Sequence, residues 1–256
     1  MELSIIIPAY NEEKRIRRTL SVYLPFFLKK FGHRFELWVV LNGCKDNTLS
    51  VVRSFSRYKQ LHILNIPEAI GKGGAIIEGF KCAKGQFVGF VDADCSTGPE
   101  AFFDLYTARH SADAILASRW IQGAIVSPPQ TFFRILSSRV FNLLVRVFFR
   151  LPIYDTQCGA KLFSKNALKK ILPTLGVTRW AFDVDLLYQL RTHGFKSVEI
   201  PTVWSDMHGS QLNLRKASIE MFFAVIRLRL LYSPFHFFIS LYDRLPGGIK
   251  LHHYLK

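Results

Sequence analysis

Two aspartates, Asp92 and Asp94, stand where a short apolar run, residues 87–91, gives way to a polar loop. Such a run is typical of a strand buried on both faces of a sheet. Carboxylates at the end of a buried strand are costly unless a partner compensates their charge. Ligands bind at the carboxyl edge of open α/β sheets, so we interpret the pair as a site for a divalent cation that carries a phosphorylated ligand. The alternative is a turn or a helix cap, because Asp-x-Asp is common by itself.

The elements before this loop alternate between strand and helix. Strands are expected at residues 3–8, 35–41 and 61–66, and helices at 14–30, from 48 to about 57, and at 71–84. This alternation predicts an α/β fold, Rossmann-like, with a mainly parallel sheet flanked by helices. The carboxyl ends of parallel strands lie at one edge, so their loops should gather there. The polar and cyclic residues that these loops supply are Pro8, Tyr10, Glu12, Asn42, Asp46 and Lys72.

The second half of the chain has a different character. A helix is expected at 99–110 and a strand at 114–117, which ends at Ser118 and Arg119; residues 123–130 read as a loop. Residues 131–150 then form an amphipathic pattern that is rich in arginine (Arg134, Arg139, Arg146 and Arg150) and has no acidic residue. A helix packed on the core and a helix lying in a lipid interface are both consistent with it, and the basic polar face favours the interface.

A polar turn at residue 154 should lead into a strand ending at 163, followed by a helix at 179–190 and a final strand at 197–200. Residues 219–232 are again basic and amphipathic. We therefore expect a domain at residues 1–210, which includes the interfacial helix, and a membrane-associated segment at residues 211–256. A packed C-terminal helix is the alternative for that segment.

Composition limits the class of protein. The chain has 256 residues, of which 49% are hydrophobic, and its 34 Lys and Arg against 19 Asp and Glu give a net charge of +15. A large core is available, and the charge favours an anionic partner. The four cysteines have no zinc-site spacing and no disulfide pattern, which favours a reducing compartment. The apolar runs are too short to span a bilayer, and Met1-Glu2 leads straight into a strand without a signal peptide. We expect a cytoplasmic protein, peripheral on the cytosolic face of a membrane.

Three signatures together resemble the family 2 glycosyltransferases of the GT-A fold. They are Pro8-Ala9-Tyr10-Asn11-Glu12, Asn42-Gly43-Cys44-Lys45-Asp46 and Asp92-Ala93-Asp94. Two later stretches, 155–163 and 179–185, are more similar to the dolichyl-phosphate glucosyltransferase branch than to the mannosyl one. The resemblance covers about residues 3–232. It departs from the family at Leu41-Asn42, where the usual pattern has two aspartates. Asn42 can accept a hydrogen bond from a uracil imide but lacks the carboxylate charge.

The resemblance implies an inverting transfer of a hexose, glucose in that branch, from a nucleotide sugar such as UDP-glucose to a polyprenyl or dolichyl phosphate at the membrane surface. Asp92 and Asp94 would hold Mg²⁺ or Mn²⁺, and Lys72 would contact the phosphates. Pro8, Tyr10 and Glu12 would cradle the nucleoside, with Asn42 and Asp46 near the base. Arg119 and Arg134 would act in catalysis on the acceptor phosphate. Arg139, Asp155, Gln157 and Asp183 would line the sugar or acceptor side.

Two other functions stay open on the residues alone. The same fold could act on a glycan or lipid hydroxyl, which needs a general base such as Asp183 or Asp185. A lipid phosphate needs none, since it is largely a dianion at neutral pH. Alternatively the chain is a basic amphipathic protein that binds lipid or nucleic acid without catalysis. No recognised nucleic-acid module is present, so we expect no nucleic-acid partner.

Overall fold

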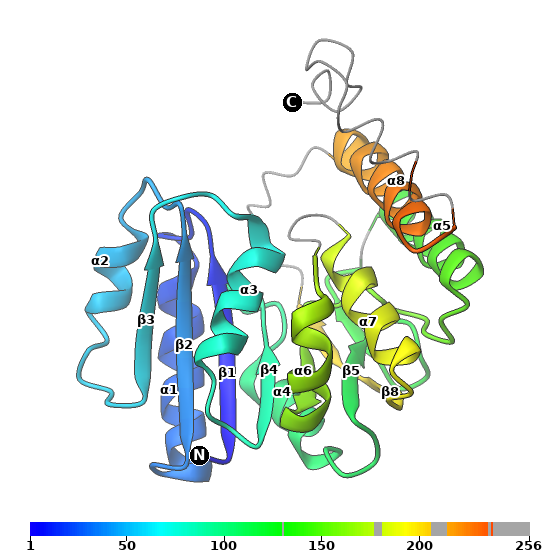
Figure 1. The fold of residues 1–256 in the computed structure, drawn as a ribbon. Helices are drawn as coiled ribbons and strands as arrows, with labels where there is room; N and C mark the ends of the chain where they lie inside the picture. The colour runs from blue at the N-terminus through cyan, green and yellow to red at the C-terminus, as the bar shows by residue number, and fades with distance from the viewer. Residues whose placement is uncertain (130, 177–180, 206–213, 235–236, 238–256) are drawn as a thin grey trace.

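The computed structural model describes residues 1–129, 131–176, 181–205, 214–234 and 237. A seven-stranded sheet with the order β3-β2-β1-β4-β7-β5-β8 forms its centre (Figure 1). Only β7 runs antiparallel to its neighbours in that sheet, so the predicted, mainly parallel α/β sheet is confirmed. The strands are β1 (Leu3–Ala9), β2 (Phe35–Asn42), β3 (Leu61–Ile66), β4 (Phe87–Phe90), β5 (Ala114–Ser118), β7 (Lys161–Ser164) and β8 (Ser197–Pro201).

Helices cover both faces of the sheet because side chains alternate along each strand. In β1, Leu3, Ile5 and Ile7 point into one core, whereas Ile6 points into the other. The first core is closed by α1 (Ile16–Phe31), α2 (Thr48–Arg53) and α4 (Pro99–Thr107). The second is closed by α3 (Gly71–Cys82), α6 (Lys165–Ile171) and α7 (Phe182–Thr192). A short 3-10 turn, Leu172–Thr174, follows α6.

Two long helices, α5 (Phe132–Phe149) and α8 (Leu214–Leu231), pack against each other and project beyond the sheet (Figure 1). Each turns a few buried residues inward: Val145 and Phe149 of α5, and Val225 and Leu228 of α8, join the second core. The helix predicted over 131–150 is therefore present and amphipathic. Helix α8 falls in the expected segment 211–256, yet its inner face belongs to the same core as α7.

Several short elements differ from the sequence-based expectation. Residues 123–130 contain a strand, β6 (Ile125–Ser127), and the strand at 197–200 is not the last, because β9 (Val203–Ser205) follows and pairs with β6. Helix α6 was not predicted. The start of the helix expected at 179 lies outside the described residues, and α7 begins at Phe182. Elements of three to seven residues are too short to show a reliable period.

Candidate active site

A cavity of about 1570 Å³ opens at the carboxyl edge of the sheet. The topology explains its position, since β1, β2, β4 and β5 all end at this edge, and β7, running the other way, begins there. The cavity brings together eleven of the residues predicted from the sequence: Pro8, Tyr10, Glu12, Asn42, Lys72, Asp92, Asp94, Arg119, Arg134, Gln157 and Asp183. It does not bring Asp46, Arg139 or Asp155 to its wall.

The loop that carries the two aspartates is held from below by helix α1. Thr19 donates a hydrogen bond of 2.6 Å to the carbonyl of Ala93, and Tyr23 donates one of 2.7 Å to the carbonyl of Thr97. Both side chains are fully buried. Within the loop, Oδ1 of Asp94 accepts a bond from the amide of Ser96 at 2.9 Å. The position of these carboxylates is thus set by α1 as much as by the strand that precedes them.

Asp92 faces a lysine across the cavity floor. Nζ of Lys72, at the start of α3, lies 2.5 Å from Oδ1 of Asp92. Burial raises the pKa of the Asp92 carboxyl, and the charge of Asp94 adds to this, although Lys72 opposes it. Burial would lower the pKa of Lys72, but Asp92 outweighs it and the pKa is raised. A concentrated negative charge at this point therefore attracts a cation strongly.

Gly159 makes room for the Asp92 carboxylate. A Cβ atom at Gly159 would lie 2.5 Å from Cγ of Asp92 and closer still to Oδ2. Real carbon contacts have their optimum near 3.5–4.0 Å. Only glycine therefore allows the backbone before β7 to approach this side chain. The glycine and the aspartate come from loops 67 positions apart in the chain, which is why sequence spacing did not connect them.

Arg15 lies behind two acidic residues of the cavity wall, Glu12 and Asp94. Its guanidinium holds Glu12 through both carboxylate oxygens, with Nε 2.7 Å from Oε2, and Nη1 lies 4.0 Å from Oδ2 of Asp94. Burial raises the pKa of Glu12 in spite of Arg15. Sequence reasoning missed Arg15. The signal was present, since Glu12 and Arg15 are three positions apart at a helix start.

The turn after β2 is built around a glycine. Gly43 has a φ of +66°, and a Cβ there would lie 2.8 Å from the backbone nitrogen of Ala69. Beside it, Oδ1 of Asn42 accepts a hydrogen bond of 2.7 Å from the amide of Ile70, which fixes the start of α3. Asn42 lines the cavity with one oxygen lone pair already used, so its NH₂ group is the freer part for a ligand.

Asp46 holds the loop together and does not face the cavity. Its oxygens accept bonds from the amide of Glu13 at 3.1 Å and from the amide of Thr48 at 3.0 Å, and Thr48 also donates its hydroxyl. Burial alone would raise the pKa of Asp46, but the bonds from Thr48 lower it. Asp46 thereby ties the loop after β1 to that after β2, and its expected place near a base stays a prediction.

Asp183 lies on the cavity wall and is paired with a buried lysine. Nζ of Lys161, which is fully buried in β7, lies 2.6 Å from Oδ1 of Asp183 and donates a second bond of 2.7 Å to the carbonyl of Cys158. A lysine inside an apolar strand is rare without a partner. That rule signalled an acidic partner for Lys161, but sequence could not say which.

Asp185 points away from the cavity. The hydroxyl of Tyr232, just beyond α8, donates to its Oδ1 at 2.5 Å, and the amide of Gly176 donates to Oδ2 at 3.3 Å. It is fully buried and connects α7 to the end of α8. Neither candidate base for a hydroxyl acceptor is therefore a free carboxylate at the cavity wall.

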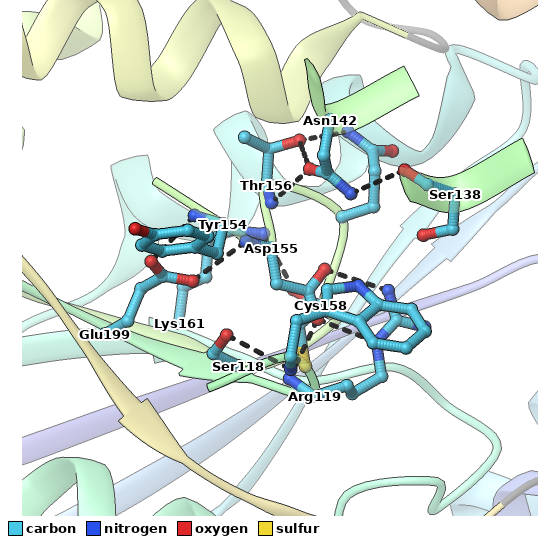
Figure 2. Close-up of polar contacts among 12 residues, drawn as sticks. Ser118, Arg119, Ser138, Asn142, Tyr154, Asp155, Thr156, Cys158, Lys161 and Glu199 are labelled. Carbon is cyan, nitrogen blue, oxygen red and sulfur yellow. Dashed lines mark hydrogen bonds and ion pairs between the residues drawn. The ribbon is translucent and has the colours of Figure 1, made fainter. Parts of the chain in front are cut away.

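Arg119 follows β5 and is locked by Asp155, as Figure 2 shows. The carboxylate of Asp155 accepts bonds from the backbone amide, Nε and Nη2 of Arg119 at 2.9, 2.8 and 2.9 Å. Burial would lower the pKa of the Arg119 guanidinium, but Asp155 outweighs it and raises that pKa. Arg119 lowers the pKa of Asp155 against the effect of burial. Asp155 is fully buried and does not line the cavity, whereas the sequence-based expectation placed it on the sugar or acceptor side.

Three arginines and two tryptophans alternate beside the cavity. The guanidinium of Arg119 lies 5.4 Å from the Trp204 ring and 5.6 Å from that of Trp120. The guanidinium of Arg134 also lies 5.7 Å from the Trp204 ring, and that of Arg139 lies 4.6 Å from the Trp120 ring. Stacking on the rings holds these planar guanidinium groups in fixed orientations. Arg134 therefore reaches the cavity, whereas Arg139 supports the stack from outside it.

The donor set fits a hard divalent cation. In the part of the chain that the structure describes, no cluster of three or more His, Cys, Asp and Glu side chains is placed to hold a metal. A metal ion at this site would therefore take one or two carboxylates from Asp92 and Asp94, and phosphate oxygens and water would complete its coordination shell. Mg²⁺ and its analogues are bound in this way beside phosphorylated substrates.

Comparisons with known proteins agree with this architecture. The family model for glycosyl transferase family 2 matches residues 4–172. The dolichyl-phosphate beta-glucosyltransferase of Drosophila melanogaster is 34% identical over 230 residues, which cover 83% of this chain and 69% of that protein. The enzyme of the same name from Saccharomyces cerevisiae is 31% identical over 249 residues, which cover 90% and 75%.

Solved structures support the fold. Glucosyl-3-phosphoglycerate synthase from Mycobacterium tuberculosis, in complex with Mn²⁺, UDP and phosphoglyceric acid, superposes with a TM-score of 0.67 at 17% identity, covering 89% of this chain and 78% of that one. The S. aureus TarS fragment 1–349 in complex with UDP-GlcNAc gives a TM-score of 0.56 at 20% identity, covering 91% and 68%. With the sheet order, the acidic loop and the family match in agreement, this chain belongs to glycosyl transferase family 2 and has the GT-A fold.

Proposed function

We propose that the protein transfers glucose from UDP-glucose, with inversion, to the phosphate of a dolichyl or other polyprenyl phosphate at a membrane surface. One observation carries the proposal: a single cavity is lined by two carboxylates at one side, by Arg119 and Arg134 at another, and by apolar side chains of α5 and α8. A nucleotide sugar, a phosphate and a lipid chain each match one of these surfaces. The two relatives named dolichyl-phosphate beta-glucosyltransferase support the choice of glucose and dolichyl phosphate.

The donor fits the acidic side. Asp92 and Asp94 would hold Mg²⁺ or Mn²⁺, which neutralises the charge that accumulates on the departing diphosphate. Lys72 and the N-terminus of α3 face the same point, and helix N-termini favour phosphate oxygens. Pro8, Tyr10 and Glu12 line the side next to Asn42, where the nucleoside would lie. The Mn²⁺ and UDP bound by a structural neighbour support this arrangement.

The acceptor side of the cavity suits a phosphate nucleophile better than a hydroxyl nucleophile. Hydroxyl attack needs a general base, but the charge of Asp183 is compensated by Lys161 at 2.6 Å, and Asp185 is bonded to Tyr232 away from the cavity. A lipid phosphate is already a nucleophilic dianion near neutral pH. Arg119 and Arg134 offer it guanidinium groups, which suit phosphate oxygens. Gln157, on the same wall, would contact the sugar together with Asp183.

The lipid side rests on exposed apolar residues. Phe132 and Phe133 of α5 are 72% and 78% exposed, and Phe223 of α8 is 51% exposed. Arginines on the same helices, such as Arg146 and Arg229, would suit anionic head groups. Among the described residues, no helix is long and apolar enough to span a bilayer. We therefore place α5 and α8 in the interface, peripheral on the cytosolic face, where four free cysteines would stay reduced.

A direct test separates the three functions. The protein is incubated with Mg²⁺ or Mn²⁺, a panel of UDP- and GDP-sugars, and either a short polyprenyl phosphate or the matching polyprenol, and the lipid product is identified by mass spectrometry and NMR. We expect a β-glucosyl phosphate from UDP-glucose and the phosphate acceptor. Asp94→Asn should abolish it, whereas Asp104→Asn, an exposed aspartate of α4, should not. Transfer to polyprenol alone would favour the hydroxyl acceptor, and no transfer at all would favour a binding protein.

A further inference from the structure

A short turn, Tyr154–Asp155–Thr156, connects the active-site arginine to helix α5 (Figure 2). Each of its three backbone amides is taken by a side chain from elsewhere in the fold. Glu199 of β8 accepts from Tyr154 at 2.7 Å and from Asp155 at 2.8 Å. The third amide, of Thr156, donates to Asn142 of α5 at 2.9 Å. The turn is therefore clamped between a strand and a helix.

Asn142 is the polar residue on the buried face of α5. It is 3% exposed, and the other buried residues of that helix are Val145 and Phe149. Its carbonyl oxygen accepts both the amide and the hydroxyl of Thr156, at 2.9 and 2.8 Å, while its NH₂ group donates to the carbonyl of Ser138 at 2.9 Å. All of these bonds fix the side chain in one orientation. A buried amide with these three bonds is costly to remove, since its partners lose their bonds in a dry site.

Asp155, the residue before Thr156 in the turn, holds Arg119. Asp155 accepts three bonds from Arg119, and two of them fix the guanidinium plane. Arg119 itself is only 11% exposed at the side chain, and that part lines the cavity. A displacement of the turn would therefore rotate the N–H groups that Arg119 presents to the cavity. Among the described residues, Asp155 is the carboxylate that bonds this guanidinium.

We propose that Asn142 is a positioning residue: through Thr156 and Asp155 it sets the orientation in which Arg119 meets the acceptor phosphate. Helix α5, which also carries Arg134 to the cavity, would thereby place both arginines relative to each other. The inference rests on the proposed function for the identity of the acceptor. It adds that acceptor use depends on a side chain that touches neither substrate.

The kinetic test uses Asn142→Leu, which has a similar volume but no carbonyl. We expect kcat/KM for a short polyprenyl phosphate to fall about tenfold, since misplacement by a fraction of an ångström is costly at a reacting centre. The Kd for UDP-glucose should change less than about twofold, because that site lies on the other side of the cavity. Gln189→Leu removes an equally buried amide, bonded to Tyr232, and should leave acceptor kcat/KM unchanged.

A double-mutant cycle with Arg119→Lys distinguishes positioning from general damage. Lysine lacks the guanidinium fork, so Asp155 no longer dictates its direction. The loss caused by Asn142→Leu should therefore shrink from about tenfold to under about twofold in the Arg119→Lys background. An equal loss in both backgrounds would overturn the proposal. If Asn142→Leu folds poorly, Thr156→Val takes its place in the test. This variant removes only the hydroxyl donor to Asn142, so we expect an intermediate loss of kcat/KM.

Hydrogen–deuterium exchange decides the matter without any lipid. In Asn142→Leu, the amide of Arg119, which donates to Asp155, should exchange faster together with that of Thr156, whereas Gln189→Leu should change neither. Faster exchange at Thr156 with an unchanged Arg119 amide would show that the clamp does not reach the arginine. Failure of the proposed function has a different signature, namely that the unmodified protein transfers no glucose to lipid phosphate.

Discussion

Replacing Gly159 by alanine should remove the activity while leaving the fold in place. The added Cβ would lie 2.5 Å from Cγ of Asp92. The obstacle is the end of a side chain and not backbone, so Asp92 can rotate away at little cost in stability. In doing so its carboxylate leaves the position in which it faces Lys72 and the proposed metal site.

The size of the effect follows from the distances. Restoring a carbon contact of 3.5 Å or more from 2.5 Å requires a shift of about 1 Å. A misplacement of about 1 Å in catalytic geometry costs on the order of 100-fold. That factor corresponds to about 2.7 kcal/mol of transition-state stabilisation. We expect Gly159→Ala to lose at least this much in kcat/KM for glucosyl transfer.

The assay pairs transfer with metal binding. Mn²⁺ affinity in the presence of UDP is measured by calorimetry, and thermal unfolding is followed on the same samples. Gly176→Ala is the matched control, since a Cβ there meets nothing within 4 Å and Gly176 has no positive φ. The reasoning fails if Gly159→Ala retains activity within about threefold of the control, or if both variants lose metal affinity equally.

Three further predictions concern other parts of the molecule. Asp155→Asn leaves the buried Arg119 charge without its partner, so we expect a loss of about 3–5 kcal/mol in the free energy of unfolding. Because the folded pKa of Asp155 lies below its ordinary value, this stability is present at neutral pH and is lost as the pH falls below about 3.9. Urea unfolding should therefore show a steeper loss of stability with acid in the unmodified protein than in the variant. Burial raises the pKa of Cys158 to about 11. Iodoacetamide at pH 8 should therefore label half-buried Cys44 well before Cys158 in the native protein, as followed by mass spectrometry. Equal labelling rates would contradict the burial of Cys158. Replacing Phe133 and Phe223 together by serine should weaken binding to phosphatidylserine vesicles at least tenfold, given about 1.5–3 kcal/mol for each fully buried Phe, whereas Val22→Ser on α1 should have no effect in the same sedimentation assay.

Much of the fold and the identity of the acidic loop could be predicted from the sequence. Apolar runs of strand length, each followed by polar residues, mark the ends of β1, β2 and β4, and parallel pairing brings those ends to one edge. The position of Asp92, Asn42 and Glu12 around one cavity follows from that rule alone. The helical period of α5 was equally readable, because eighteen residues cover five turns.

Only the tertiary structure decided which charges meet. Lys161 with Asp183, Arg119 with Asp155, and Gly159 against Asp92 join segments that are far apart in the chain. The antiparallel insertion of β7 makes these contacts, and a strand of four residues carries no sign of its direction. A pattern of side chains records which face of an element is buried, but the partner across the interface depends on distances that folding alone creates. For that reason Asp155 was expected at the sugar and lies instead behind Arg119.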